Sequence, residues 1–163
     1  MAKDLFLIRH AHAVHSSNIR DFDRSLSEKG FSEGFKMAQE FKRYTAVPDL
    51  IITSPARRAL QTASLFAEAF HLTTHQIQPE NMIYEADVSS LLSIINHVSD
   101  EIQTITLFGH NPGITLFAGY LNGNLIGHIA TAGIVHIHFE TIDSWKFVSQ
   151  GLGEIKWAAE PNT

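Results

Sequence analysis

Short apolar runs alternate along this chain with longer segments in which apolar positions recur at helical spacing. Runs with the length of buried strands occur at 5–8, 50–53, 104–108 and 134–139. A weaker run lies near 77–83, and the run at 145–148 predicts a last strand at an edge of the sheet. Strands that alternate with helices in this way favour an α/β sandwich whose central sheet is mainly parallel.

Capping residues precede the segments that we expect to be helical. Ser27 is placed to cap a helix whose inward stripe is predicted to be Phe31, Phe35, Ala38 and Phe41. Ser54 is placed to cap the next helix, with Pro55 at its first position, where the missing N–H costs nothing. Asp87 is placed to cap a third helix, and a fourth is predicted through 116–120.

The composition is that of an ordinary globular protein. A chain of 163 residues with 44% hydrophobic and 18% charged residues favours a single domain over 1–163. No uninterrupted apolar run approaches the ~18 residues of a transmembrane helix. The start Met-Ala-Lys-Asp leads into a strand-like run without the layout of a signal peptide, so we expect a cytoplasmic protein without membrane association.

Charge and cysteine content exclude further classes of function. The net charge is −5 and no dense run of Lys or Arg occurs, so no nucleic-acid partner is expected. The chain has no cysteine, which excludes disulfides, thiolate metal sites and cysteine nucleophiles. Histidine is abundant, with 10 residues, and only the positions of these residues can indicate their chemistry.

Basic side chains follow three of the predicted strands at the point where each strand ends. They are Arg9 and His10, then the adjacent Arg57 and Arg58, then His110. Because ligands bind beyond the carboxyl ends of the strands in open α/β sheets, we expect these side chains to converge on one cleft. A guanidinium grips phosphate oxygens with a planar fork, and the free N–H groups of a helix that starts near Pro55 also favour an anion.

Four segments resemble the histidine phosphatase superfamily, and most closely its short SixA-type phosphohistidine phosphatase branch. They are "LIRHAHA", "DFDRSLSEKG", "SPARRALQTA" and "FGHNPGI", which occur in the order of the family and span most of the chain. The resemblance implies one histidine phosphatase domain with the phosphoglycerate mutase-like fold, a three-layer α/β/α sandwich.

The resemblance also implies a role for each matched residue. His10 would be the nucleophile that takes the phosphoryl group as a phosphohistidine intermediate. Arg9, Arg58 and His110 would bind the phosphate oxygens, with Asn111 as a further phosphate-binding neighbour. No metal or other cofactor is implied, because two arginines and a second histidine supply the charge stabilisation that phosphoryl transfer needs.

The sequence departs from the family pattern at two places. Ala11 replaces the glycine after the Arg-His pair, and its methyl group is expected to crowd the pocket. The general acid is open between Glu85, Asp87 and none, and we favour Glu85 because Asp87 is expected to cap a helix. An enzyme that expels the good leaving group of a phosphoramidate would need only a weak acid. Arg57, which the family pattern passes over, is expected at the rim or the surface.

Several alternatives stay open. A metal hydrolase built on His10 and His12 is the main rival, although the barrels that use such a pair need ~250 residues. His136 and His138 share one face of their strand, which we interpret as a solvated or partly packed face rather than a metal pair. The substrate is either a phosphorylated protein or a small phosphate ester, so a small-molecule phosphatase, a mutase or a non-catalytic phosphate-binding module stays possible.

Overall fold

The computed structural model describes residues 2–161 and contains one six-stranded sheet. Its strands are β1 (Lys3–Arg9), β2 (Leu50–Thr53), β3 (Ile77–Pro79), β4 (Thr104–Gly109), β5 (Ile134–Phe139) and β6 (Glu154–Ala159). Their spatial order is β3-β2-β4-β1-β5-β6. The first four of these are mutually parallel, and β5 and β6 are antiparallel to their neighbours. The prediction of a mainly parallel sheet is confirmed.

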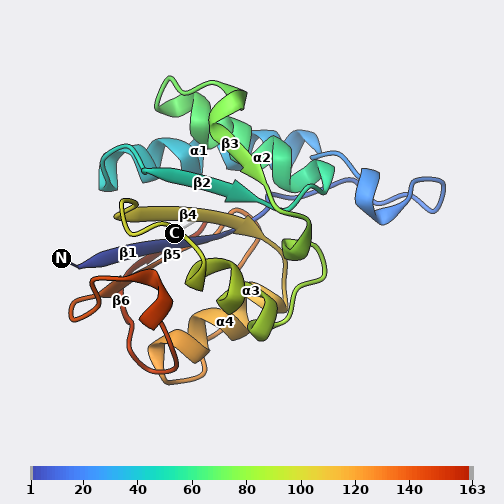
Figure 1. The fold of residues 1–163 in the computed structure, drawn as a ribbon. Coiled ribbons are helices and arrows are strands. Elements are labelled where there is room, and N and C mark those ends of the chain that lie inside the picture. The colour runs from blue at the N-terminus through green and yellow to red at the C-terminus, as the bar shows by residue number, and fades with distance from the viewer. Residues whose placement is uncertain (1, 162–163) are drawn as a thin grey trace.

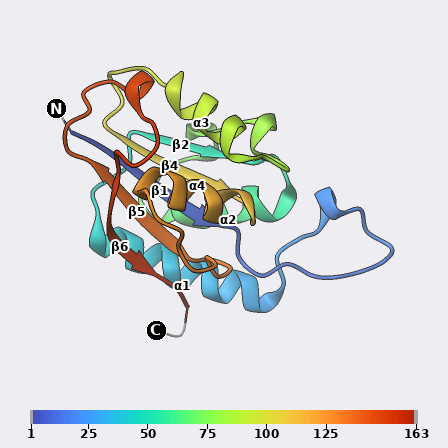
Figure 2. The ribbon, with the colours of Figure 1, turned by 90° about the horizontal axis from the view of Figure 1, so that it is seen from below.

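Two pairs of helices cover the two faces of the sheet. On one face lie α1 (Glu28–Tyr44) and α2 (Arg57–Ala69), and on the other lie α3 (Val88–Asn96) and α4 (Gly113–Asn122), as Figures 1 and 2 show. The side chains of β1 alternate between the two faces of the sheet. Phe6 and Ile8 pack towards α1 and α2. Leu5 and Leu7 pack towards α3 and α4. The three-layer α/β/α architecture is therefore confirmed. None of the helices in the described part of the chain has the length and apolar character that a membrane crossing requires.

Two of the three predicted helix caps are confirmed. The side chain of Ser27 accepts a hydrogen bond from the Gly30 N–H at the start of α1, and Asp87 does the same for α3. The prediction for Ser54 and Pro55 is wrong, because α2 begins only at Arg57. The N–H of Ser54 still donates to β4, at Phe108 O (3.0 Å), so the chain leaves the sheet too late to begin the helix at Pro55.

The inward stripe of α1 differs from the predicted one. Phe31 and Phe35 are 42% and 59% exposed, and their assignment to the core is wrong. The buried positions of α1 are Gly30, Gly34, Met37, Ala38 and Phe41. Two glycines carry no hydrophobic signal, so the helical period was assigned to the aromatic residues beside them.

The last predicted strand is also wrong. Residues Trp145–Phe147 form a 3-10 turn, and Trp145 is fully buried with its indole N–H donating to Ile102 O (2.7 Å). The edge strand is instead β6, where alternate residues are exposed. The weak run near 77–83 is divided between the short β3 and a 3-10 turn over Asn81–Ile83.

The first turn of α1 packs directly against the segment that follows β1. A Cβ atom at Gly30 would collide with the backbone carbonyl oxygen of His12, so only glycine permits this approach. We expect Gly30→Ala to lower the free energy of unfolding by roughly 2 kcal/mol, the usual cost of overpacking. Chemical denaturation measures the effect. Gly127→Ala is the matched control, since a Cβ there meets no atom within 4 Å, and equal stability of the two variants would contradict the prediction.

Candidate active site

A cavity of about 630 Å³ lies beyond the carboxyl ends of the parallel strands. All four basic residues predicted to converge, Arg9, His10, Arg58 and His110, line its wall. The segment between β1 and α1 projects past this end of the sheet in Figures 1 and 2 and contributes further residues to the wall. The sequence prediction that these side chains share one cleft is therefore confirmed as geometry.

The sheet explains this convergence. Arg9 is in register with Gly109 on the neighbouring parallel strand, and the His10 N–H donates to the Gly109 carbonyl (3.1 Å). The Ser54 N–H donates to β4 in the same way from the other side. The loops after β1, β2 and β4 therefore leave the sheet at one level, and the side chains that follow each strand meet there.

His10 is a buried imidazole, with 8% of its surface exposed. Its Nδ1 lies 2.7 Å from the Ala11 carbonyl, which can only accept, and its Nε2 accepts from the Arg58 Nε–H (3.3 Å). These partners place the ring proton on Nδ1 and leave the lone pair on Nε2. Burial is the main cause that lowers the pKa of His10 to about 3; the hydrogen bond to the Ala11 carbonyl opposes this shift, and the nearby His110 and Arg58 add to it. The ring is therefore neutral near pH 7.

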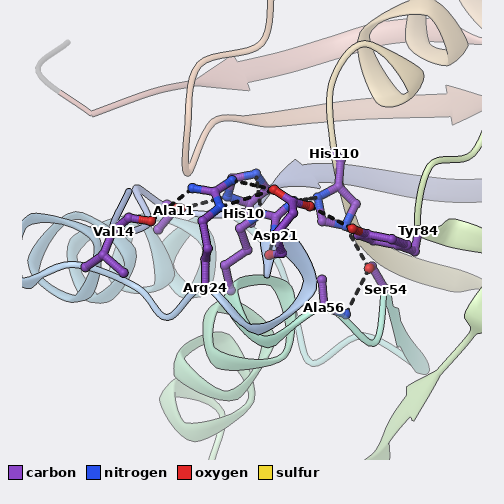
Figure 3. A network of polar contacts seen from close by, with 10 residues as sticks. His10, Ala11, Val14, Asp21, Arg24, Ser54, Ala56, Tyr84 and His110 are labelled. Carbon is purple, nitrogen blue, oxygen red and sulfur yellow. Dashed lines mark hydrogen bonds and ion pairs between the residues drawn. The ribbon is translucent and has the colours of Figure 1, made fainter. Parts of the chain in front are cut away.

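Arg58 contacts His10, Asp21 and His110, which Figure 3 labels as part of one network of polar contacts. Its guanidinium is buried and donates through Nη1 to the Asp21 carbonyl (2.7 Å) and through Nη2 to Asp21 Oδ2 (3.1 Å). Nη2 also lies 3.3 Å from His110 Nδ1. Arg57 is exposed, as predicted, so of the two adjacent arginines only Arg58 enters the cavity.

His110 faces His10 across the cavity, with ring centroids 5.2 Å apart. Its Nε2 lies 2.7 Å from Ser54 Oγ, so the serine that fails to cap α2 holds this ring instead. Burial lowers the pKa of His110 to about 4, and the charge of Arg58 contributes to the shift. In the neutral His110 ring, Nδ1 accepts from the Arg58 Nη2–H, so Nε2 carries the proton and donates to Ser54 Oγ.

Arg9 and Asn111 meet at the Ile129 carbonyl. Arg9 Nη1 donates to this oxygen (3.1 Å), while its buried Nε has no hydrogen-bond partner among the described residues. The Asn111 amide donates to the same oxygen (2.7 Å), and its own oxygen accepts from Thr115 (2.6 Å). Asn111 lines the cavity, but these contacts occupy its amide in bracing the chain next to Arg9.

The wall includes a hydrogen-bonded group of three residues that was not predicted from the sequence. Tyr84 donates from its hydroxyl to Asp21 Oδ2 (2.7 Å), and Arg24 donates to Asp21 Oδ1 (3.0 and 3.1 Å). The hydrogen bond from Tyr84 holds the pKa of Asp21 at about 2, assisted by Arg24 and Arg58. Asp21 and Arg24 lie in the segment "DFDRSLSEKG", but nothing in its pattern indicates that it folds back over the cavity.

The two candidate acids occupy different positions. Glu85 is exposed, lines the cavity and has a left-handed backbone (φ 57°). At the start of α3, the carboxylate of Asp87 accepts a hydrogen bond from the Ser90 N–H (2.8 Å). Hydrogen bonding to Ser90 lowers the pKa of Asp87. Glu85 therefore remains a candidate by location, and Asp87 is committed to its cap.

Ala11 does not crowd the cavity, contrary to the expectation. It is fully buried, lies outside the cavity wall, and donates its N–H to Thr62 Oγ1 (3.0 Å). Its methyl group points towards α1, where a Cβ at Gly34 would lie 3.6 Å from it. That distance is an ordinary van der Waals contact, so the additional methyl group packs on the α1 side without crowding.

No group of three or more side chains with metal-ligand spacing lies at this cavity among residues 2–161. Its wall instead includes the fixed cations Arg9, Arg24 and Arg58, the carboxylates of Asp21 and Glu85, and the neutral imidazoles of His10 and His110. Guanidinium groups around a neutral imidazole nitrogen can bind a tetrahedral oxyanion and attack its central atom.

Comparison with known proteins identifies the class to which this fold and site belong. Residues 5–91 match the model of the histidine phosphatase superfamily (branch 1). The chain belongs to this superfamily, and the family resemblance read from the sequence is confirmed.

Individual relatives agree with this assignment. The crystal structure of a protein from Agrobacterium tumefaciens, provisionally named as the phosphohistidine phosphatase SixA, is 28% identical, with a TM-score of 0.79 and coverage of 98% of this chain and 99% of that one. The structure of the protein histidine phosphatase SixA in complex with tungstate has a TM-score of 0.82 at 21% identity, over 97% of each chain. An uncharacterized chloroplastic protein of Arabidopsis thaliana is 33% identical over 132 residues, which cover 76% of this chain and only 61% of that protein.

The protonation of three histidines tests the electrostatics of the cavity. With a pKa of about 3 for His10 and about 4 for His110, both rings should be neutral at pH 6, whereas hydrogen bonds to Asp4 and Glu140 raise the pKa of His138 above 6.5 and keep it charged there. NMR titration of the imidazole resonances measures this, with His10→Gln and His138→Gln as assignment controls.

The same pKa shifts predict how the free energy of unfolding depends on pH. Between about pH 4 and 6.5 the unfolded chain binds more protons at His10 and His110 than the folded chain, so these two groups make stability fall as the pH falls through that window. His138 acts in the opposite direction, since its contribution is lost as the pH rises through its raised pKa. A His10 resonance that titrates near pH 6.5 would contradict the structure.

Proposed function

We propose that this protein is a metal-independent phosphatase that acts through a phosphohistidine on His10. The observation that carries the proposal is the buried, neutral His10 ring, whose Nε2 lone pair faces Arg58 inside the cavity. Arg9 and His110 line the same cavity and complete a cradle for phosphate oxygens. Membership of the histidine phosphatase superfamily supports the same chemistry.

In the first proposed step, His10 Nε2 attacks phosphorus, a P–N bond forms, and the bond to the leaving group breaks. The Ala11 carbonyl, 2.7 Å from Nδ1, holds the ring orientation and stabilises the positive charge that develops on the imidazole. Water then attacks the phosphohistidine, the P–N bond breaks, and inorganic phosphate leaves. Arg9 and Arg58 would stabilise the charge on the phosphoryl oxygens in both transfers.

We further propose a phosphoramidate, and most specifically a phosphohistidine carried by a protein, as the substrate. The arrangement of acids supports this choice. Asp21 is held ionised by its hydrogen bonds, and Glu85 is an exposed residue of the wall. A site without a buried acid suits a leaving group that departs easily, such as the imidazole of phosphohistidine. The SixA names of the structural relatives point to the same substrate class.

Replacement of the nucleophile tests the reaction directly. His10→Ala should lower the turnover of an aryl phosphate by roughly 10³-fold or more, because it removes the atom that accepts the phosphoryl group. Brief incubation with labelled substrate, followed by quenching and mass spectrometry, should locate phosphate on His10 in the wild type. EDTA should leave the rate unchanged.

Two adjacent arginines provide the matched control. Arg57→Ala changes an exposed residue and should keep near-normal turnover, whereas Arg58→Ala removes the central guanidinium and should lose most of it. Near-normal turnover by His10→Ala would show that His10 is not the nucleophile. Binding of phosphate without any turnover would favour a phosphate-binding module instead, and loss of activity with EDTA would favour the metal hydrolase.

The dependence on the leaving group tests the role of Glu85. Aryl phosphates and phosphoramidates should be hydrolysed at least ~10²-fold more efficiently than alkyl phosphates, because a phenolate leaves unprotonated and solvent protonates the phosphoramidate nitrogen, whereas the alkoxide needs a proton from an acid in the site. Glu85→Gln should lower only the residual alkyl phosphatase activity, by about 10-fold or more. Glu101→Gln, at another exposed position, is the control. Equal efficiency of the wild type on both substrate classes would show that a strong acid acts in the site.

A further inference from the structure

A second polar cluster lies at the opposite end of β1 from the cavity. Asp4 stands near the start of β1, and His136 and His138 stand on the antiparallel strand β5, where His138 is in register with Asp4. All three face the α1 side of the sheet, since Phe6 between them packs against α1. At ~3.3 Å per residue, Asp4 is about 17 Å along the strand from Arg9, so this cluster is separate from the candidate active site.

The cluster brings three metal-ligand atoms together. Asp4 Oδ1 lies 2.7 Å from His136 Nε2 and 2.7 Å from His138 Nδ1, and the ligand atoms of the three residues all lie within 4.8 Å of one another. Around a tetrahedral Zn²⁺, nitrogen and oxygen ligands at ~2.1 Å are separated by about 3.4 Å. Small rotations of the three side chains would therefore replace the hydrogen bonds with bonds to a metal ion.

The outer nitrogen of each imidazole already has a partner. His136 Nδ1 lies 2.7 Å from the Tyr44 hydroxyl, and His138 Nε2 lies 2.6 Å from Glu140 Oε2. Metal-binding histidines usually have such a partner on the ring nitrogen that does not bind the metal, because it fixes the tautomer and the ring orientation. Phe6 stacks on the His136 ring at 4.4 Å and holds it from one side. The rings are thus oriented in the way that a metal site requires.

The charges around the cluster also suit a cation. Asp4 and Glu140 contact the histidines, and Glu154 of β6 is in register with His138. The cation nearby on that strand, Lys156, is paired with Glu154 (3.2 Å). His138 lies between two carboxylates, so in the metal-free protein it carries a proton on each ring nitrogen, and a metal ion would displace the proton that faces Asp4.

From this geometry we infer that Asp4, His136 and His138 form a binding site for a divalent transition-metal ion of the Zn²⁺ type. Two imidazoles and one carboxylate are ligands that such ions accept, and softer thiolate ligands do not occur in this chain. The three side chains are 31%, 12% and 20% exposed, which leaves a fourth coordination position open to water. The ion would tie β1 to β5 and, through Tyr44, to the end of α1.

Both histidines are partly buried, with 12% and 20% of their side chains exposed, so the predicted partly packed face is confirmed. The proposed metal site goes beyond that interpretation. The sequence placed both histidines on one strand face and favoured a solvated or partly packed surface. It could not show Asp4 between them, because that contact joins residues 132 and 134 positions apart. The inference does not depend on the proposed phosphatase activity, since the ion would have no place in the reaction at His10.

Metal titration of the purified, chelator-treated protein tests the inference. Co²⁺ should give the visible absorption bands of a tetrahedral nitrogen and oxygen site, and Zn²⁺ should bind with one equivalent by calorimetry. His138→Gln should abolish the Co²⁺ bands, whereas His75→Ala, at an exposed histidine elsewhere, and His10→Ala, in the cavity, should keep them. Glu140→Gln leaves the three ligands in place and should weaken Zn²⁺ binding about 10-fold.

Thermal unfolding provides a second readout that does not depend on spectra. At about a hundred times its dissociation constant, Zn²⁺ should raise the melting temperature of the wild type by about 5 °C or more, and that of His138→Gln by much less. Cooperative melting of each variant without metal verifies that it is folded. No Co²⁺ bands in the wild type, equal bands in His138→Gln, or bands lost in His10→Ala would each overturn the inference.

Discussion

The candidate site depends on one buried guanidinium. Arg58 carries a permanent charge in a place where water cannot solvate it, and the cost of burying an unpaired charge amounts to several kcal/mol. Asp21 compensates that charge with its carboxylate and its backbone carbonyl. Because Asp21 belongs to the segment between β1 and α1, the ion pair also folds this segment over the cavity. The same guanidinium contacts His10 and His110, so the geometry of the whole wall follows from where α2 places Arg58.

The other residues of the cavity wall balance the charges around Arg58. In the proposed reaction a dianionic phosphoryl group must share Arg58 with the carboxylate of Asp21. Tyr84 and Arg24 donate to that carboxylate independently, so Asp21 keeps partners when phosphate takes donors of Arg58. Arg9 brings a second guanidinium from β1. The histidines stay neutral because burial beside these cations lowers their pKa, and neutrality is the state in which His10 is a nucleophile.

The sequence predicted the layers, the mainly parallel sheet and the convergence of four basic residues, because each depends on local patterns and on a general rule about strand ends. It failed where a residue without a hydrophobic signal decided the packing, as Gly30 and Gly34 do in α1. It also failed where a polar side chain found a distant partner. The hydrogen bond between Ser54 and His110 spans 56 positions and that from Tyr84 to Asp21 spans 63, and no local pattern encodes either.

The candidate active site and the Asp4 cluster lie at the two ends of the same strand for one physical reason. The middle of β1, from Leu5 to Ile8, is covered on both faces by helices and is fully buried, so an ionisable side chain there would lack water and partners. At either end of β1 the cover of the helices stops, and loops or helix ends can supply polar partners and opposite charges. Arg9 and His10 contact polar groups of the loops beyond the carboxyl ends of the strands, and Asp4 contacts two histidines of β5. The apolar middle of the strand holds the two clusters apart, so a change at one end reaches the other only through the packed core.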